Sequence, residues 1–306
     1  VRERGHDALL DAKNPTDLNK SFHDDNSNAH VICTRDGCLS ILKDESFVQP
    51  KIADAVAEIG ARLELNVKAI EDFLRHNPIQ IDGEAHSARR KLFLNEYNGK
   101  CKDSIEKFKE IAETHFELFS KKNPSCAASA LIDPYVDSVL QTILETYDRS
   151  AAALYESVRG QGYVLFEYIH PPARLSEKSR QAENFLAGLD LADEMPDVSR
   201  ERGLFMLTYI LQGRDPLLGG LGAYLHGLLE LDEAERLARI DTTTARELFW
   251  HSSPVNYIGR VATKTKTVDG ITINPGDRIL LMLPWANHGE GCTAKDSIAF
   301  GSGPHV

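Results

Sequence analysis

The sequence has little of what marks secreted, membrane-spanning or metal-finger proteins. Its 306 residues include only five cysteines, at scattered positions: Cys33, Cys38, Cys101, Cys126 and Cys292. An odd number without a Cys-x-x-Cys pair argues against a disulfide framework and a cysteine-based metal site, and favours a reducing, cytoplasmic location. No apolar run approaches the roughly 20 residues that cross a bilayer.

The sequence also lacks a basic stripe, internal repeats and low-complexity tracts. Its net charge is −11, from 46 acidic and 35 basic residues. This balance argues against nucleic acids and anionic membranes as partners. The composition is 42% hydrophobic and 26% charged, which is typical of a globular protein with a core large enough to enclose a cofactor. We expect one domain over residues 1–306, incomplete at its C-terminus and, because it begins with Val, at its N-terminus.

Helical periodicity dominates the chain. Apolar residues recur at steps of three and four over 52–74, which predicts one amphipathic helix, and again over 104–119. A third helix is predicted over 134–154, with Asp133 as its N-cap and Pro134 at its first position.

A long apolar stretch over residues 198–231 predicts a buried central helix. Pro216 lacks a backbone N–H, so we expect a disturbance or kink in the middle of this helix.

Strand patterns occur only near the two ends. The segment AHVICT at 29–34 predicts one strand, and residues 260–283 alternate as several strands do. Asp269-Gly270 and Pro275-Gly276-Asp277 supply turn chemistry between these strands. The pattern as a whole predicts an α+β protein, mainly helical, with small β regions near both ends.

Four segments occur in a familiar order: HVICTRDGCLSILKDESF, IDGEAHSARRKLF at 81–93, LQGRDP at 211–216, and ELFWHSSPVNYIGRVA continuing to IAFGSGPHV. Together they resemble the cytochrome P450 family in its soluble bacterial form. The resemblance runs from about residue 29 to the end and is strongest over 247–306. It implies a P450-like fold and a haem cofactor.

The resemblance assigns the residues that contact the two haem propionates. They are His86, Arg90, Arg260 and His305. Taken without the resemblance, His86 and Arg90 are a solvated helix face and Arg260 is a surface charge at a strand start.

The final loop matches the family's cysteine-ligand loop. Phe300, Gly301 and Gly303 fit this pattern, and the thiolate that ligates iron would follow Val306. Cys292 lies before the loop and is a weak substitute. Gly213 lies on the predicted central helix, where it serves either cofactor contact or close helix packing.

Two motifs depart from the family. The Glu-x-x-Arg motif is here Glu247-Leu-Phe-Trp250, and Trp cannot reproduce a bidentate arginine pair, so we interpret Trp250 as core packing. The acid–Thr pair of the central helix is here Asp215-Pro216, and proline has no hydroxyl. The connection between Asn287 and Ser297 is also short. These departures argue against standard oxygen activation.

The leading hypothesis is therefore an atypical haem-thiolate oxidoreductase that oxidises or rearranges a small hydrophobic substrate of secondary metabolism, such as a terpenoid, fatty acid or polyketide. Asp215 is its candidate proton relay, or simply a residue that stops a helix. Electrons would come from a ferredoxin- or flavodoxin-type partner.

Two alternatives remain at the level of sequence. One is a haem-free helper that binds and stabilises a partner enzyme, which the altered Trp250 and Pro216 motifs favour. The other is an acid–base enzyme without haem, for which the sequence shows no compact constellation. A cysteine codon after Val306 would separate the first hypothesis from the helper.

Overall fold

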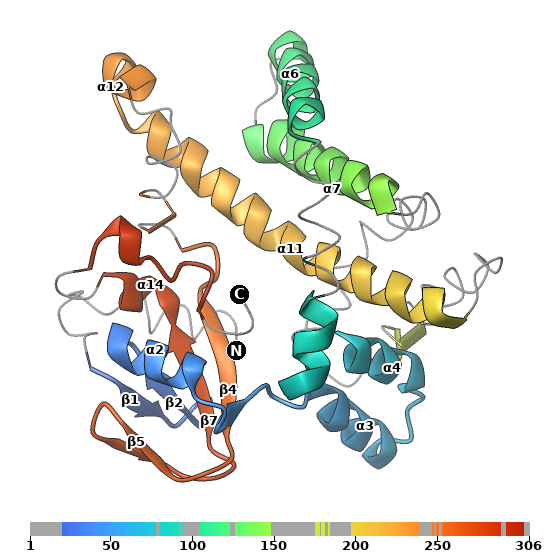
Figure 1. The fold of residues 1–306 in the computed structure, drawn as a ribbon, viewed down its shortest axis with the longest axis vertical. Coiled ribbons are helices and arrows are strands. Elements are labelled where there is room, and N and C mark those ends of the chain that lie inside the picture. The colour runs from blue at the N-terminus through green and yellow to red at the C-terminus, as the bar shows by residue number, and fades with distance from the viewer. Residues whose placement is uncertain are drawn as a thin grey trace. The chain divides into compact units, whose positions relative to one another are not determined.

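The computed structural model describes residues 20–77, 80–91, 94, 104–122, 126–147, 175–177, 179–180, 183, 197–238, 247, 249–250, 253–288 and 292–302. Helices predominate and the sheets are small, which confirms the predicted α+β class (Figure 1). The chain divides into two compact units, one of residues 1–50 with 219–306 and the other of residues 51–218. We call them the sheet unit and the helical unit, and describe each by itself.

The sheet unit contains a five-stranded sheet in the order β1-β2-β7-β4-β3. The strands are β1 (Phe22–Asp24), β2 (Ala29–Ile32), β3 (Phe47–Val48), β4 (Tyr257–Ala262) and β7 (Arg278–Met282). Only β2 and β7 are parallel, with Ile32 opposite Leu281. The pairing joins the two ends of the chain, so both predicted β regions form one sheet.

A separate hairpin joins β5 (Lys266–Val268) and β6 (Ile271–Ile273). Asp269 and Gly270 both have positive φ, of 53° and 77°, as a two-residue hairpin turn requires. Gly276, with φ of 91°, occupies the turn before β7. The turn chemistry predicted at both places is confirmed.

Two short helices cover the sheet. Figure 1 shows α2 (Arg35–Lys43) beside the sheet, and α14 (Leu283–Asn287) packs against α2. Thr34 caps α2, because its Oγ1 accepts a hydrogen bond from the Gly37 amide at 3.0 Å. Buried apolar side chains join these helices to the sheet: Ile32, Cys38, Ile41, Leu42, Ala262, Ile279, Leu281, Leu283 and Ala286.

The helical unit begins with two helices, α3 (Ile52–Arg62) and α4 (Lys68–His76), so the prediction of one helix over 52–74 was wrong. Glu64 takes a left-handed φ of 52°, and the Leu65 amide donates to the Gly60 carbonyl at 2.9 Å. This bond belongs to a helix C-terminus that turns the chain back. The apolar period runs on across the turn because Val67 packs directly on Gly60.

Helices α6 (Ile105–Lys122) and α7 (Asp133–Tyr147) pack against each other, and both were predicted. Residues 148–154, the end of the predicted third helix, lie outside the described residues. The role of Asp133 as an N-cap was wrong. A π-helix, η3 (Ala128–Ile132), precedes α7 without a break, and Asp133 itself has helical dihedrals. Its carboxylate instead accepts a bond from Arg214.

The long central helix is α11 (Asp197–Leu229), which continues through Pro216 without a break. The division between the two units falls within it, after Leu218. A helix over residues 83–91 belongs to the helical unit, and α12 (Glu233–Ala238) and the 3₁₀ turn η4 (Ala294–Asp296) belong to the sheet unit. Across the described parts of the chain, none of the helices combines the length and the apolarity that crossing a bilayer demands.

Candidate functional site

One candidate group lies on the helix of residues 83–91 in the helical unit. His86 and Arg90 are one helical turn apart and therefore share a face. His86 is only 5% exposed. This face of the helix is therefore not solvated at His86, although a face with His and Arg is expected from sequence alone to be solvated. The Nε atom of Arg90 is buried and has no hydrogen-bond partner among the residues that the structure describes. A buried donor of this kind costs free energy unless an acceptor reaches it.

A second candidate, Arg260, lies inside β4 of the sheet unit rather than at the start of a strand. It is 3% exposed. Its Nη1 donates to Oε1 of Gln49 at 3.1 Å and to the carbonyl of Gly259 at 2.8 Å. Burial of a guanidinium is costly unless polar atoms surround it, so this strand position is built for a cation.

The third candidate is the loop of residues 298–302. Gly301 is buried and has a φ of +94°, which side-chain-bearing residues rarely adopt. Its amide donates to the Ile298 carbonyl at 2.8 Å and closes a tight turn. The Ser253 hydroxyl donates to the Ala299 carbonyl at 2.9 Å and fixes the loop from outside. Phe300 remains 44% exposed at the tip.

The altered Glu-x-x-Arg motif lies against this loop. The rings of Phe249 and Phe300 meet edge to face, 5.6 Å apart. Trp250 donates its indole N–H to the Asn287 carbonyl at 2.7 Å. Trp250 therefore makes a directed polar contact, where the sequence suggested packing alone.

Asp215 and Gly213 both lie on the central helix α11, but their surroundings differ. Partial burial raises the pKa of Asp215, the nearby Arg214 opposes this shift, and the Asp133 carboxylate adds to it. The Asp215 side chain is still largely exposed, so solvent screens the shift. Among the described residues, a Cβ added at Gly213 would meet no atom within 4 Å, so none of them packs closely on Gly213.

Arg214 is the residue of this helix that makes strong contacts. Its Nε donates to Oδ1 of Asp137 at 2.8 Å, and its Nη2 donates to Oδ1 of Asp133 at 3.2 Å. These bonds join α11 to α7 within the helical unit. Sequence reasoning singled out Asp215 and missed its neighbour, although the spacing of Asp133 and Asp137 on one helix face was a usable signal.

The structure groups the candidates only in part. Phe300 and Gly301 share one loop, and Arg260 belongs to the same unit; His86, Arg90 and Asp215 belong to the other. Gly303, His305 and Val306 lie outside the described residues. Cys292 is a free, half-buried thiol before η4. Within the described residues, the protein's own histidine, cysteine and acidic side chains form no cluster that could hold a metal ion.

Ser253 and Asn287 are functional candidates that the sequence did not reveal. Each holds the loop of residues 298–302 through one hydrogen bond, from Ser253 Oγ to the Ala299 carbonyl and from the Ile298 amide to Asn287 Oδ1. Both lie within the segments that resemble the family, but no spacing within those segments distinguished them from the other polar residues there.

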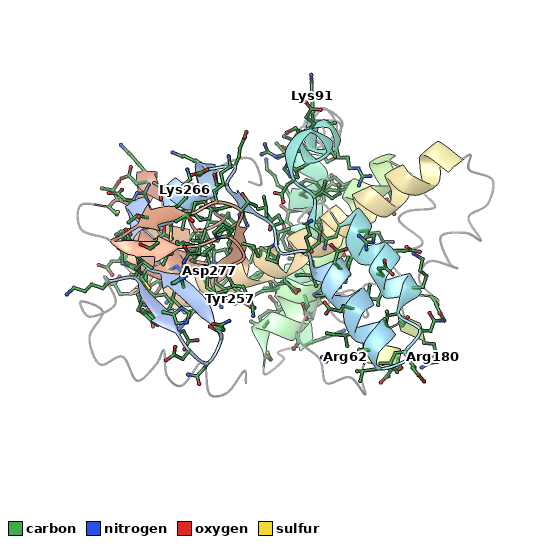
Figure 2. All side chains as sticks on the ribbon, turned by 90° about the horizontal axis from the view of Figure 1, so that it is seen from below. Arg62, Lys91, Arg180, Tyr257, Lys266 and Asp277 are labelled. Atoms are coloured by element: carbon green, nitrogen blue, oxygen red, sulfur yellow. The ribbon has the colours of Figure 1, made fainter. Side chains whose placement is uncertain are left out.

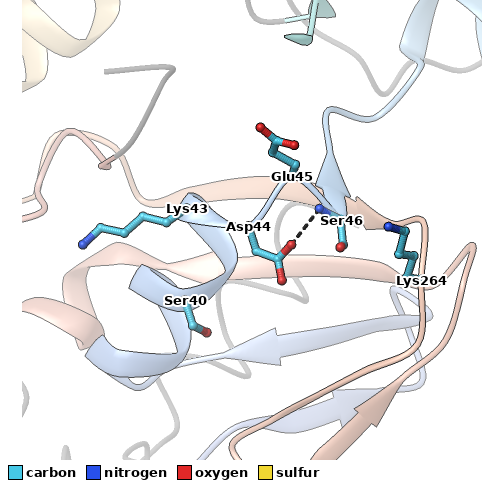
Figure 3. Close-up of a pocket in the computed structure, with 6 residues that line it drawn as sticks. All are labelled: Ser40, Lys43, Asp44, Glu45, Ser46 and Lys264. Carbon is cyan, nitrogen blue, oxygen red and sulfur yellow. Dashed lines mark hydrogen bonds between the residues drawn. The ribbon is translucent and has the colours of Figure 1, made fainter.

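A shallow hollow of about 590 Å³ lies elsewhere in the sheet unit (Figure 3). Its lining is polar: Ser40, Lys43, Asp44, Glu45, Ser46 and Lys264. None of the candidate residues lines it. An open, charged hollow is unlike the apolar pockets that enclose small molecules, so we assign it no binding role.

Asp44, one of the residues that line this hollow, gives a test of acid stability. Lys266, labelled in Figure 2, lies 2.8 Å from Oδ2 of Asp44, and this bond lowers the Asp44 pKa to about 2. The ion pair therefore stabilises the fold above about pH 4 and is lost as the pH falls toward 2. Solvent screening limits its contribution to about 1 kcal/mol. We expect Asp44→Asn to destabilise the protein clearly at pH 6 and much less at pH 2, where about half of the Asp44 carboxyl is protonated, measured by urea unfolding. Equal losses at both pH values would contradict the assignment.

The fold is shared with solved structures of cytochromes P450. The epothilone D-bound P450epoK superposes with a TM-score of 0.67 at 17% identity, over 94% of this chain and 80% of that one. P450BioI, solved with an acyl carrier protein bearing hexadec-9Z-enoic acid, gives 0.66 at 15% identity over 91% and 74%. The Bacillus subtilis bacillaene polyketide synthase cytochrome P450 PksS gives 0.62 at 18% identity over 90% and 76%.

This chain thus has the cytochrome P450 fold, as the motifs predicted. No protein-family model matches the sequence, and no curated protein matches it either. The identity to the solved structures is low, so the likeness establishes the architecture and leaves the chemistry to be argued from the residues.

Proposed function

We propose that the protein is a haem-thiolate oxidoreductase that acts on a small or medium-sized hydrophobic substrate. The observation that carries the proposal is the loop of residues 298–302. It is a tight, externally anchored turn with a buried glycine at a φ of +94°. Such a turn brings backbone close to a flat cofactor, and only residues 303–306 separate it from the position at which the family's pattern has cysteine.

The cationic residues described above fit this cofactor. A haem carries two propionates. Arg90 has a buried Nε donor without a partner among the described residues, and Arg260 is buried in the sheet. We propose that His86, Arg90 and Arg260 hold the propionates together with His305. When bound, a thiolate-ligated haem supplies the oxidising chemistry, because the thiolate pushes electron density toward iron.

Asp215 is the proposed proton carrier of the central helix. Its carboxyl is partly buried and its pKa is raised, which makes it a better proton donor near neutral pH than an ordinary aspartate. Pro216 offers no hydroxyl to accompany it. We therefore propose oxidation or rearrangement that departs from standard oxygen activation.

The proposed partners follow from the fold neighbours. The solved P450 structures hold epothilone in one case and a fatty acyl chain on a carrier protein in another. We propose a hydrophobic substrate of this size, free or carried on a protein, with Gly213 leaving space for it or for the cofactor. A ferredoxin- or flavodoxin-type protein would deliver electrons.

The deciding experiment is the absorption spectrum of protein expressed from its full reading frame, reduced, with and without carbon monoxide. A red-shifted carbonyl band of thiolate-ligated haem is the expected result. A protein that stays colourless after addition of haemin would overturn the proposal. The haem-free helper would then be tested by isolating the enzyme that copurifies with it.

Arg260 gives a sharper test of the propionate assignment. Removal of a charge-assisted hydrogen bond costs about 1.5–3 kcal/mol, which corresponds to roughly 10- to 150-fold weaker haem retention. We expect this loss in Arg260→Leu, measured as the rate of haem transfer to apomyoglobin. Arg278→Leu, on the neighbouring strand and exposed, is the matched control and should retain haem. Equal retention in both variants would contradict the assignment.

A further inference from the structure

Asn287, the last residue of α14, connects the loop of residues 298–302 to Trp250 through two hydrogen bonds. The amide of Ile298 donates to Asn287 Oδ1 at 2.8 Å. The carbonyl of the same asparagine accepts the indole N–H of Trp250 at 2.7 Å. One buried residue thus connects the helical turn that contains Trp250 to the first residue of the loop.

The burial of Asn287 shows why this connection is specific. Asn287 is completely buried, and within the described part of the chain its Nδ2 has no hydrogen-bond partner. A buried amide nitrogen without an acceptor costs free energy that an apolar residue would avoid. The favourable part of this side chain is therefore its Oδ1 bond to the loop, which an apolar residue could not make.

Trp250 bonds the backbone carbonyl of Asn287, whereas the loop bonds its side chain. Its ring packs on His288, with ring centroids 5.4 Å apart, and this holds the indole in place. The neighbouring Phe249 contacts Phe300 at the tip of the loop. A Cβ at Gly220 would lie 2.8 Å from Cε1 of Phe249, so α11 approaches this ring closely. The turn of residues 249–250 therefore contacts the tip of the loop through Phe249 and is connected to its base through Asn287.

We propose that Trp250 and Asn287 form a clamp that positions the loop of residues 298–302. The clamp sets the angle at which the chain leaves Ile298 toward Gly301. Both residues are positioning residues that act through the loop. For haem binding the inference depends on the proposed function, whereas the hydrogen-bond relay itself can be tested without haem.

The first test measures hydrogen exchange by NMR in the haem-free full chain. The chain has only two tryptophans, Trp250 and Trp285, so its indole N–H signals are readily assigned. We expect Trp250→Phe to accelerate exchange of the Ile298 amide at least tenfold relative to the Leu281 amide in the centre of the sheet. Trp285→Phe, on the same short helix as Asn287, is the matched control and should leave this ratio unchanged.

Substitutions of Asn287 test the other half of the clamp. Asn287→Leu removes the acceptor and should give the same tenfold loss of protection at Ile298. Asn287→Asp keeps an oxygen at the Oδ1 position and should restore most of that protection. An unchanged ratio in Trp250→Phe and Asn287→Leu would overturn the proposal, and so would equal acceleration at Ile298 and Leu281, which signals global unfolding.

If both variants fail to fold, the unmodified protein decides the question. The clamp requires the Trp250 indole N–H to exchange at least tenfold more slowly than that of Trp285, for which the described residues provide no acceptor. Equal rates would overturn the proposal.

A haem readout separates this inference from the proposed function. In protein from the full reading frame, Trp250→Phe should shift the Soret band and lower haem occupancy, whereas Trp285→Phe should not. Normal haem binding in Trp250→Phe with unchanged Ile298 exchange overturns the clamp and leaves the proposed function intact. Slow exchange at Ile298 and at the Trp250 indole in a protein that binds no haem supports the clamp and overturns the proposed function.

Discussion

Arg214→Leu is expected to lower the free energy of unfolding of the helical unit by about 3 kcal/mol. The guanidinium bonds Asp137, whose side chain is 12% exposed, and also Asp133 on the same helix. Removal of Arg214 deprives the buried Asp137 carboxylate of this charge partner, and that cost exceeds the lost attraction itself. Urea unfolding followed by far-UV circular dichroism measures the change.

Two further variants make this expectation specific. Arg75 also bonds two carboxylates, those of Asp54 and Glu71, but its side chain is 47% exposed. Arg75→Leu should therefore cost far less, because water screens exposed pairs. Arg214→Leu combined with Asp137→Leu should recover most of the stability, since no buried carboxylate then remains at that position. Equal losses at Arg75 and Arg214 would show that burial does not govern the pair.

The second large effect is expected at Gly301. A side chain at a φ of +94° costs about 1–3 kcal/mol in strain. The loop can relax when no cofactor is present, but binding must restore the strained turn. Gly301→Ala should therefore weaken haem retention by roughly 5- to 150-fold. The ratio of haem to protein after gel filtration measures this loss.

Gly276 provides the matched control for Gly301. Its φ of 91° is nearly the same, and a Cβ there would meet nothing within 4 Å. Gly276→Ala thus introduces similar backbone strain into the turn before β7, in the same unit. We expect Gly276→Ala to lose stability but retain haem, and Gly301→Ala to lose haem. Loss of haem in both would mean that general destabilisation, and not loop geometry, controls binding.

Much of the fold followed from local patterns. The periodicity of α6 and α7, the alternation of the C-terminal strands and the Asp269-Gly270 turn all appear as predicted, because period and turn chemistry are local properties of the chain. The pattern was misleading where a helix ended without a glycine. At Glu64 a left-handed residue reverses the chain, yet the apolar period continues, because Val67 packs back on Gly60.

The candidate site likewise has features that follow from the sequence and features that depend on the fold. By itself, the sequence determined the order of its motifs, the glycine of the final loop, and the departures at Trp250 and Pro216. It could not determine the burial of Arg260, which depends on strands from both ends of the chain. Nor could it assign a partner to Trp250, since an indole N–H bonds whichever carbonyl the fold brings near it.

What the sequence by itself determined is the class of fold and the chemical types of the residues at each motif, because both depend on spacing along the chain. Only the tertiary structure decided which of those residues act together. Trp250, Asn287 and Ile298 are separated by up to 48 positions, and two hydrogen bonds connect them. Hydrogen bonds reach about 3 Å whatever the separation in sequence, so only folding reveals them.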